Sequence, residues 1–304
     1  MAKVAVTGSS GLIGRALAAS LAAGGHEVIR LVRGPARGAG EVHWDPQSPG
    51  GLDPAVLDGT DAVVNLAGAP IAGGRWTDAR KAELRSSRIQ TTATLVQAIK
   101  AATAPPATLV SGSAIGWYGD TGDRIVDESA PAGAGFLAGL VRDWEQAAAG
   151  AREAGTRVAC ARTGIVLSRS GGMLGQLLPV FRLGLGARLG GGDQYISWIS
   201  LTDEVRAIRF LLDTPAAQGA FNLTAPEPVT NTVFTALLAA QVSRPALLRL
   251  PSVLLKAGLG ELSGELLSSA RVLPRALTEA GFEFRHRDLR AALAAELATG
   301  RPAA

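Results

Sequence analysis

The sequence predicts an α/β protein built on a doubly wound parallel sheet, with a small, mostly helical domain at its C-terminal end. Three observations predict this. Short β-rich runs alternate with helical segments along most of the 304-residue chain, a glycine triplet separates the first run from the first helix, and helical patterns dominate after Pro228. Strands that alternate with helices are typical of a parallel sheet covered on both faces.

The expected elements follow one another along the chain. Strands are expected at VAVTG, EVIRLV, EVHW, DAVVNLAG, ATLVSGS and RVACARTGIVL, and helices over 13–23, 80–100 and 137–154. After Leu167 a glycine-rich passage has no clean period of either type. The segments YISWIS, LTDEVRAIRFLLD and GAFNLTA then predict strand, helix and strand, which returns the chain to the main sheet.

These elements predict two domains. The first, a nucleotide-binding domain, is placed at residues 1–225, with residues 166–199 contributing to the substrate cleft, and the C-terminal substrate-side domain at 226–304. The last six residues, TGRPAA, are expected to fray.

Composition argues against several classes of protein. Hydrophobic residues make up 47% and charged residues 18%, which is enough apolar material for a packed core. The formal charge of +4 is spread along the chain, which argues against nucleic-acid binding. No apolar run is long enough for a membrane helix, and the three histidines are too scattered for a metal site. The single cysteine, Cys160, fits a reducing compartment. We therefore expect a cytoplasmic protein with a small-molecule partner, whose oligomeric state the sequence leaves open.

The glycine triplet indicates a dinucleotide. In VAVTGSSGLIGRAL, the residues Gly8, Gly11 and Gly14 directly follow the first strand and open the first helix. Glycine permits the tight turn and the close backbone approach that a pyrophosphate needs, and the helix N-terminus offers free N–H groups. The strand-to-helix context therefore predicts a Rossmann domain, although the first spacing differs by one residue from the commoner G-x-G-x-x-G.

The end of the second strand indicates which dinucleotide. An NAD site usually ends this strand with an acid that holds the ribose 2′-hydroxyl, and here Arg33 stands there instead. A guanidinium at this position would pair with a 2′-phosphate, so we expect NADP(H).

Several motifs together resemble the extended short-chain dehydrogenase/reductase superfamily: VTGSSGLIG, NLAGAP, SGSAIGWYGD and RTGIVL. Others are similar to its atypical, epimerase-like SDR39U branch and to the small C-terminal domain of that branch: GRWTDARKAELRSSRI, DWE, SWISLTDEVRAI, FNLTAPEPVTN and LPRALTEAGFEFRHRDLRAAL. The resemblance implies an NADP(H)-binding oxidoreductase or epimerase-like protein that acts on an unidentified carbonyl or sugar-like molecule.

The resemblance also implies roles for individual residues. The pyrophosphate loop would comprise Gly8, Ser10, Gly11, Leu12, Ile13 and Gly14. The adenosine and ribose would lie over Leu66, Ala67 and Gly68. Arg33 would contact the 2′-phosphate, Ser113 would hydrogen-bond a substrate oxygen, and the stretch from Arg162 to Val166 would lie near the nicotinamide. Ser200 departs from the pattern, because many relatives are expected to carry a histidine there.

The usual catalytic pair is missing. Typical members carry a tyrosine and a lysine four residues apart on one helix, and the corresponding helix here offers Phe136 and Leu140. The chain has only two tyrosines, Tyr118 and Tyr195, and neither is followed by a lysine at that spacing.

Three explanations remain open. Tyr118 could act as the acid beside Ser113, although its segment could equally just shape the loop. A group such as Arg75, Asp203 or Ser200 could polarise the carbonyl, although Asp203 also suits a helix cap. Finally, the protein could bind NADP(H) without efficient turnover, as a sensor or scaffold.

Overall fold

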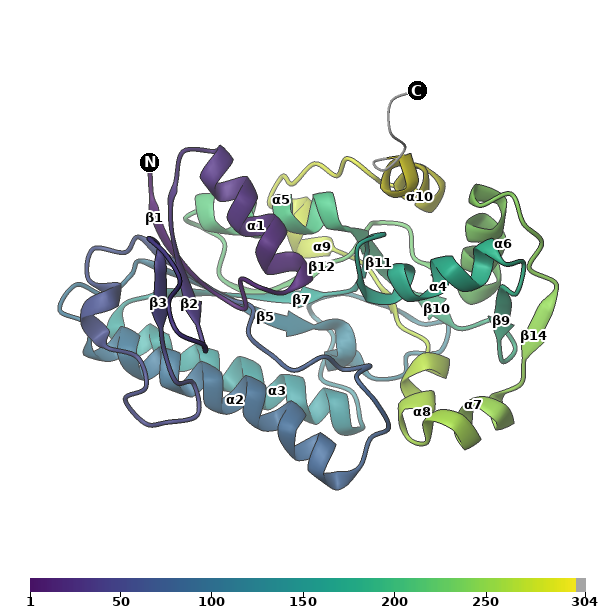
Figure 1. The fold of residues 1–304 in the computed structure, drawn as a ribbon, viewed down its shortest axis with the longest axis horizontal. Coiled ribbons are helices and arrows are strands. Elements are labelled where there is room, and N and C mark those ends of the chain that lie inside the picture. The colour runs from purple at the N-terminus through teal and green to yellow at the C-terminus, as the bar shows by residue number, and fades with distance from the viewer. Residues whose placement is uncertain (299–304) are drawn as a thin grey trace.

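The computed structural model describes residues 1–298 and centres on one seven-stranded sheet (Figure 1). The order is β12-β7-β5-β4-β1-β2-β3, and all neighbouring strands are parallel. The strands are β1 (Lys3–Thr7), β2 (Glu27–Val32), β3 (Glu41–His43), β4 (Ala62–Asn65), β5 (Thr108–Ala114), β7 (Arg157–Thr163) and β12 (Gly219–Leu223). This confirms the doubly wound fold. The order reverses at β1, and in such sheets ligands bind beyond the carboxyl ends of the strands at that point.

Helices cover both faces of the sheet (Figure 1). One face carries α1 (Leu12–Ala23) and α5 (Leu201–Asp213), and the other carries α2 (Asp78–Ala101) and α3 (Phe136–Ala149). Strand residues alternate between the two layers. In β1, Val4 and Val6 belong to the core with α1 and α5, whereas Ala5 belongs to the core with α2 and α3. Burial on both faces explains why the central strands β1, β4 and β7 read as largely apolar runs.

A second group of short elements lies beside the carboxyl ends of the strands, to the right in Figure 1. It contains the helices α4 (Gly172–Arg182), α6 (Asn231–Gln241), α7 (Ser252–Leu259), α8 (Leu262–Leu267) and α10 (Leu289–Ala298). Its strand pairs are β8 (Ile165–Leu167) with β11 (Trp198–Ser200), β10 (Tyr195–Ile196) with β13 (Val229–Thr230), and β9 (Ala187–Leu189) with β14 (Leu248–Leu250). A last pair joins β6 (Ile125–Val126) to β15 (Arg271–Val272), and α9 (Arg275–Glu279) lies against β12.

The structure of this region differs from the expectations in three segments. The glycine-rich passage contains the helix α4, which the sequence did not predict. The run RVACARTGIVL is two strands in different sheets, because the chain breaks at Gly164. A Cβ there would lie 2.6 Å from the carbonyl oxygen of Ser197, so the two backbones touch. Likewise YISWIS forms β10 and β11 outside the main sheet, and only β12 returns to it.

The C-terminal region does not stand apart from the sheet. Leu277 and Phe282 belong to the same core as Val4 and Val6, while α10 packs with α4 and α6. The domain boundary after residue 225 therefore stays a prediction, and the predicted fraying of TGRPAA lies outside the described residues. Within residues 1–298, no helix combines the length and the apolar character needed to cross a membrane.

Candidate functional site

The loop between β1 and α1 has glycine at the positions where its backbone approaches other backbone segments most closely. Gly8 has φ +64°, and a Cβ there would lie 2.5 Å from the carbonyl oxygen of Leu66. A Cβ at Gly14 would lie 2.2 Å from the carbonyl oxygen of Gly8, because the helix packs directly on the loop. At both positions only glycine lets the backbones approach this closely.

The N-terminus of α1 is open to an anion. Gly11 is the N-cap and supplies no side-chain hydrogen bond, and the first turn, which begins with Leu12 and Ile13, has no acidic residue. The N–H groups of this turn and the helix dipole therefore face the loop, where Ser10 is exposed. Together with the glycine surface, this is a cradle that fits a dinucleotide pyrophosphate.

The segment after β4 lies next to the cradle. The hydroxyl of Thr7 accepts hydrogen bonds from the N–H groups of Leu66 (3.0 Å) and Ala67 (3.1 Å). It donates to the side-chain oxygen of Asn65 at 2.7 Å. These bonds tie the ends of β1 and β4 together, so the residues predicted to underlie the adenosine border the glycine loop.

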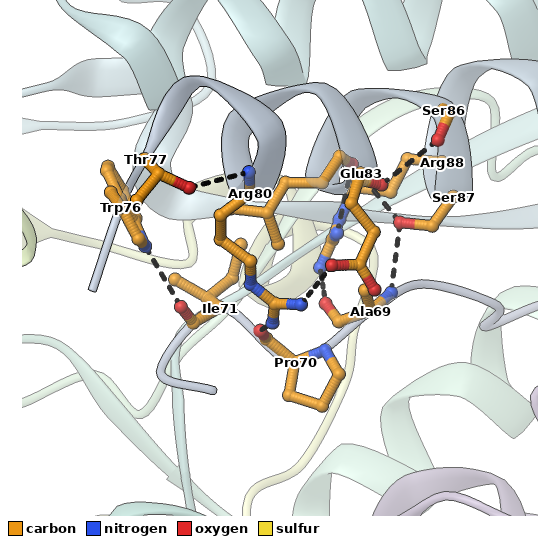
Figure 2. A network of polar contacts seen from close by, with 11 residues as sticks. Ala69, Pro70, Ile71, Trp76, Thr77, Arg80, Glu83, Ser86, Ser87 and Arg88 are labelled. Atoms are coloured by element: carbon orange, nitrogen blue, oxygen red, sulfur yellow. Dashed lines mark hydrogen bonds and ion pairs between the residues drawn. The ribbon is translucent and has the colours of Figure 1, made fainter. Parts of the chain in front are cut away.

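The chain beyond Gly68 is held by α2 (Figure 2). The hydroxyl of Ser87 accepts from the N–H of Ala69 at 3.1 Å, and Arg88 donates to the carbonyl oxygen of Ala69 at 2.9 Å. Arg80 donates to the carbonyl oxygen of Pro70. Side chains of one helix thus fix the backbone of this loop.

Arg88 places a buried positive charge directly behind Gly68. Only 9% of this residue is exposed, and its guanidinium carbon lies 3.1 Å from where a Cβ of Gly68 would be. It also donates to the carbonyl oxygen of Leu84 at 3.2 Å and lies over the ring of Trp144. Burial lowers the pKa of Arg88 to about 10, so the side chain stays charged at neutral pH.

Arg33 follows directly after β2, and its side chain is exposed at the carboxyl edge of the sheet. The nearby acid of β3, Glu41, is engaged elsewhere. It forms a 3.0 Å ion pair with Arg30 and accepts a 2.8 Å hydrogen bond from the N–H of Arg37. This arrangement leaves Arg33 available to a ligand phosphate.

Three residues predicted separately, Ser113, Tyr118 and Arg162, share one hydrogen-bond network. Ser113 donates to Glu145 of α3 at 2.6 Å. Arg162 holds both oxygens of Glu145, at 2.8 and 2.9 Å, and donates to the hydroxyl of Tyr118 at 3.0 Å. Tyr118 in turn donates to the side-chain oxygen of Asn222 at 2.8 Å.

The network is almost closed to solvent. Ser113 is 5% exposed and both Tyr118 and Arg162 are 3% exposed, with the ring of Trp117 stacked 3.9 Å from the guanidinium. Burial raises the pKa of Tyr118. Its proton is directed at Asn222 and not toward Ser113, so the geometry does not favour Tyr118 as the acid.

Glu145 and Asn222 were not singled out from the sequence as site residues. A signal existed for Glu145, because it is a carboxylate on a helix face that also carries the buried Val141, Trp144 and Ala148. A charge in that position needs a partner. No comparable signal marks Asn222, which lies in an ordinary strand.

The positions of the missing tyrosine and lysine are used for packing. Phe136 makes an edge contact with Trp76 at 5.2 Å, and Leu140 shares a small core with Trp76, Leu84 and Leu262 of α8. This half of α3 therefore joins the sheet domain to the C-terminal helices.

Of the other three groups that could polarise a carbonyl, Ser200 and Asp203 are engaged in structural hydrogen bonds. Ser200 accepts from the N–H of Asp203 at 3.1 Å and caps α5, and it contacts Nδ1 of His286 at 2.9 Å. Asp203 is 1% exposed and accepts from the N–H of His286 and from Arg206. Arg75 is exposed in the loop before α2.

One buried acid lies where β7 ends. Thr163 donates to Oε1 of Glu204 at 2.8 Å, and no described residue hydrogen-bonds Oε2. Burial raises the pKa of Glu204 to about 8. Within residues 1–298, no group of three or more acidic, His or Cys side chains could hold a metal ion.

Comparison with known proteins agrees with this geometry. Residues 4–224 match the NAD dependent epimerase/dehydratase family. The chain belongs to this family. Residues 250–296 match a domain of unknown function, DUF1731.

Individual relatives cover nearly the whole chain. An epimerase family protein of Mycobacterium bovis is 52% identical over 302 residues, which is 99% of each chain. Human epimerase family protein SDR39U1 is 36% identical, over 96% of this chain and 98% of its own. A crystal structure of the human protein with NADPH superposes with a TM-score of 0.89 at 34% identity, over 98% of this chain and 100% of that one. The resemblance to the SDR39U branch is thereby confirmed.

Proposed function

We propose that the protein binds NADP(H) and acts as an oxidoreductase or epimerase-like enzyme on a small carbonyl or sugar-like molecule. The glycine cradle between β1 and α1 carries this proposal, because a Cβ at Gly8 or Gly14 would overlap backbone atoms. Nothing in ordinary helix packing requires the open N-terminus that accompanies it. The NADPH in the crystal structure of the human relative supports the choice of cofactor.

The cofactor would be held by groups already in place. The N–H groups at the start of α1 and the surface of Gly8 and Gly11 would bind the pyrophosphate. The segment from Leu66 to Gly68 would support the adenosine and ribose, and Arg33 would pair with the 2′-phosphate. When bound, the nicotinamide supplies or accepts a hydride.

The reacting oxygen of the substrate would contact Ser113, at the carboxyl end of β5. Arg162 is paired with Ser113 in the sheet register, so it keeps the network in place beside the predicted nicotinamide site. Replacing Ser113 by Ala should cut turnover while the affinity for NADPH stays nearly constant. Equal loss of both would remove this role from Ser113.

A second function belongs to another class. In a cofactor-dependent sensor or scaffold, NADP(H) would stabilise one conformation that a partner recognises. This alternative is favoured by the closed network, in which Ser113 and Arg162 both donate to Glu145 and Arg162 also donates to Tyr118. It is also favoured by the packing of Phe136 and Leu140. Turnover of any member of a panel of alcohols and carbonyls would exclude it.

Arg33→Ala tests the cofactor assignment. A lost charge-assisted hydrogen bond is worth roughly 1.5–3 kcal/mol, so NADPH affinity should fall about 10- to 150-fold, measured by nucleotide fluorescence. NADH affinity should hardly change, because NADH has no 2′-phosphate. Arg290→Ala, an exposed arginine on α10, is the control and should leave both affinities as they are. An equal loss for both nucleotides in Arg33→Ala would contradict the assignment.

A further inference from the structure

The hydroxyl of Ser113 has a single proton, and that proton is already used in a hydrogen bond to Glu145. Its oxygen lies 2.6 Å from Oε1 of Glu145. Arg162 donates to both oxygens of Glu145, which is the bidentate geometry of a guanidinium–carboxylate pair. An ionised carboxylate can only accept hydrogen bonds, so Ser113 must be the donor in this pair.

This direction decides what Ser113 can offer to a ligand. With its proton on the side of Glu145, the oxygen presents only lone pairs, and it can accept a hydrogen bond but cannot donate one. A carbonyl oxygen needs a hydrogen-bond donor, so it is not a suitable partner for Ser113 while the serine donates to Glu145. A substrate hydroxyl group, which can donate to the serine oxygen, is a suitable partner.

We propose that Ser113 and Glu145 form a proton relay that accepts the proton of a substrate alcohol. The inference rests on the proposed function and names its substrate class. As the hydride leaves the alcohol carbon for the oxidised nicotinamide, the O–H proton passes to Ser113, whose own proton passes to Oε1 of Glu145. The products are a carbonyl compound, the reduced cofactor and a protonated Glu145. In the reverse direction, Ser113 can donate to a carbonyl only after Glu145 has taken up a proton.

The surroundings of the pair fit such a relay. Tyr118 does not compete, because its hydroxyl lies between Arg162 and Asn222. Arg162 keeps the stacked ring of Trp117 and the hydroxyl of Tyr118 as partners when Glu145 becomes neutral. The side chain of Glu145 is 14% exposed, compared with 4% for that of Arg162, so a proton can leave it for water.

An infrared comparison tests the hydrogen bond between Ser113 and Glu145 without any substrate. The full chain loaded with NADP+ is measured as wild type, Ser113→Ala and Glu145→Gln, with Asp143→Asn as the control. Asp143 is a carboxylate of the same helix that pairs with Arg85. We expect Glu145→Gln to remove one carboxylate band, and Ser113→Ala to shift that same band because its hydrogen bond is lost. A band that Ser113→Ala leaves in place overturns the relay.

Turnover tests the role in the reaction. The wild type is offered NADP+ with a panel of secondary alcohols and polyols. Glu145→Gln should lower kcat about 100-fold or more, while NADP+ binds within about two-fold of wild type. Asp143→Asn should behave as wild type. If Glu145→Gln keeps the wild-type kcat, Glu145 takes no part in the proton transfer and the relay is wrong.

Two controls keep the outcomes separate. Thermal unfolding shows whether Glu145→Gln folds; if it does not, Ser113→Ala carries the kinetic test, with the same loss of kcat expected. A wild type that binds NADP+ but oxidises no alcohol overturns the enzymatic function and the substrate class, whereas the infrared shift still decides whether the two side chains are coupled.

Discussion

The close approach at the glycine loop makes Gly8→Ala the sharpest stability test of the site. The substitution adds two costs. Left-handed backbone costs an alanine about 1–2 kcal/mol, and Gly8 has φ +64°. The new Cβ would also lie 2.5 Å from the carbonyl oxygen of Leu66, and overpacking of this kind costs about 1–3 kcal/mol. We expect a total loss of roughly 2–5 kcal/mol in the free energy of unfolding, a large share of the stability of a typical protein.

Neighbouring glycines give a graded series. Gly14→Ala meets only the overlap, 2.2 Å from the carbonyl oxygen of Gly8, and should cost about 1–3 kcal/mol. Gly11 has an ordinary φ of −74° and its Cβ would lie 3.2 Å from the same oxygen, so Gly11→Ala should cost less than about 1 kcal/mol. Gly139→Ala in α3 meets nothing within 4 Å and should stabilise by about 0.5–1 kcal/mol.

Urea unfolding followed by tryptophan fluorescence measures the free energy of unfolding of each variant. Titration of each folded variant with NADPH measures its affinity for the cofactor. The expected order of destabilisation is Gly8→Ala, then Gly14→Ala, then Gly11→Ala. A Gly8→Ala protein as stable as the wild type, with unchanged NADPH affinity, would refute the close approach and the cradle built on it.

Three further predictions follow from buried groups. Burial raises the pKa of Glu204 in the folded protein to about 8, compared with an ordinary 4.5, so between these pH values Glu204 is protonated only in the folded state. The free energy of unfolding should therefore fall as pH rises through this range, by up to about 1.4 kcal/mol per pH unit. Urea titrations at several pH values measure this slope, and Glu204→Gln should lack it. Arg162→Met leaves Glu145 without its buried partner and should cost about 3–5 kcal/mol, and adding Glu145→Leu should recover part of it; a double variant less stable than Arg162→Met would contradict this. Burial raises the pKa of Cys160 to about 12, so a thiol reagent should label the native protein only as fast as it unfolds, and rapid labelling without denaturant would show that the strand is open.

Local patterns were enough to predict the sheet domain. Parallel strands buried on both faces give short apolar runs, and the predicted run DAVVNLAG contains β4, whose four residues are all buried. The glycine triplet could also be recognised from the sequence, because the positive φ of Gly8 and its close approach to the backbone of Leu66 are conditions that only glycine meets. The role of Arg33 was predicted from the absence of an acid at the end of the second strand, and it stays a prediction.

The remaining features depend on contacts between distant parts of the chain. The helix α4 was overlooked although Leu174, Leu178 and Phe181 have helical spacing, because its glycines and Pro179 obscure the period. Ser113 and Glu145 are 32 residues apart, so the bond that gives the serine its direction is invisible in either segment alone.

The same holds for the tyrosine. Tyr118 and Asn222 are 104 residues apart, and only the fold shows that the hydroxyl is engaged by this partner. The sequence could therefore show that the usual pair is missing, but not that α3 uses Phe136 and Leu140 to hold the C-terminal helices.

We propose that the glycine cradle and Arg33 together form an NADP(H) site. Titration of the wild-type protein with NADPH and with NADH, in one buffer at one salt concentration and followed by nucleotide fluorescence, tests it most directly. Saturable binding that favours NADPH by at least about ten-fold is the predicted result. Preference for NADH would contradict the role of Arg33, and no binding of either nucleotide would contradict the site itself.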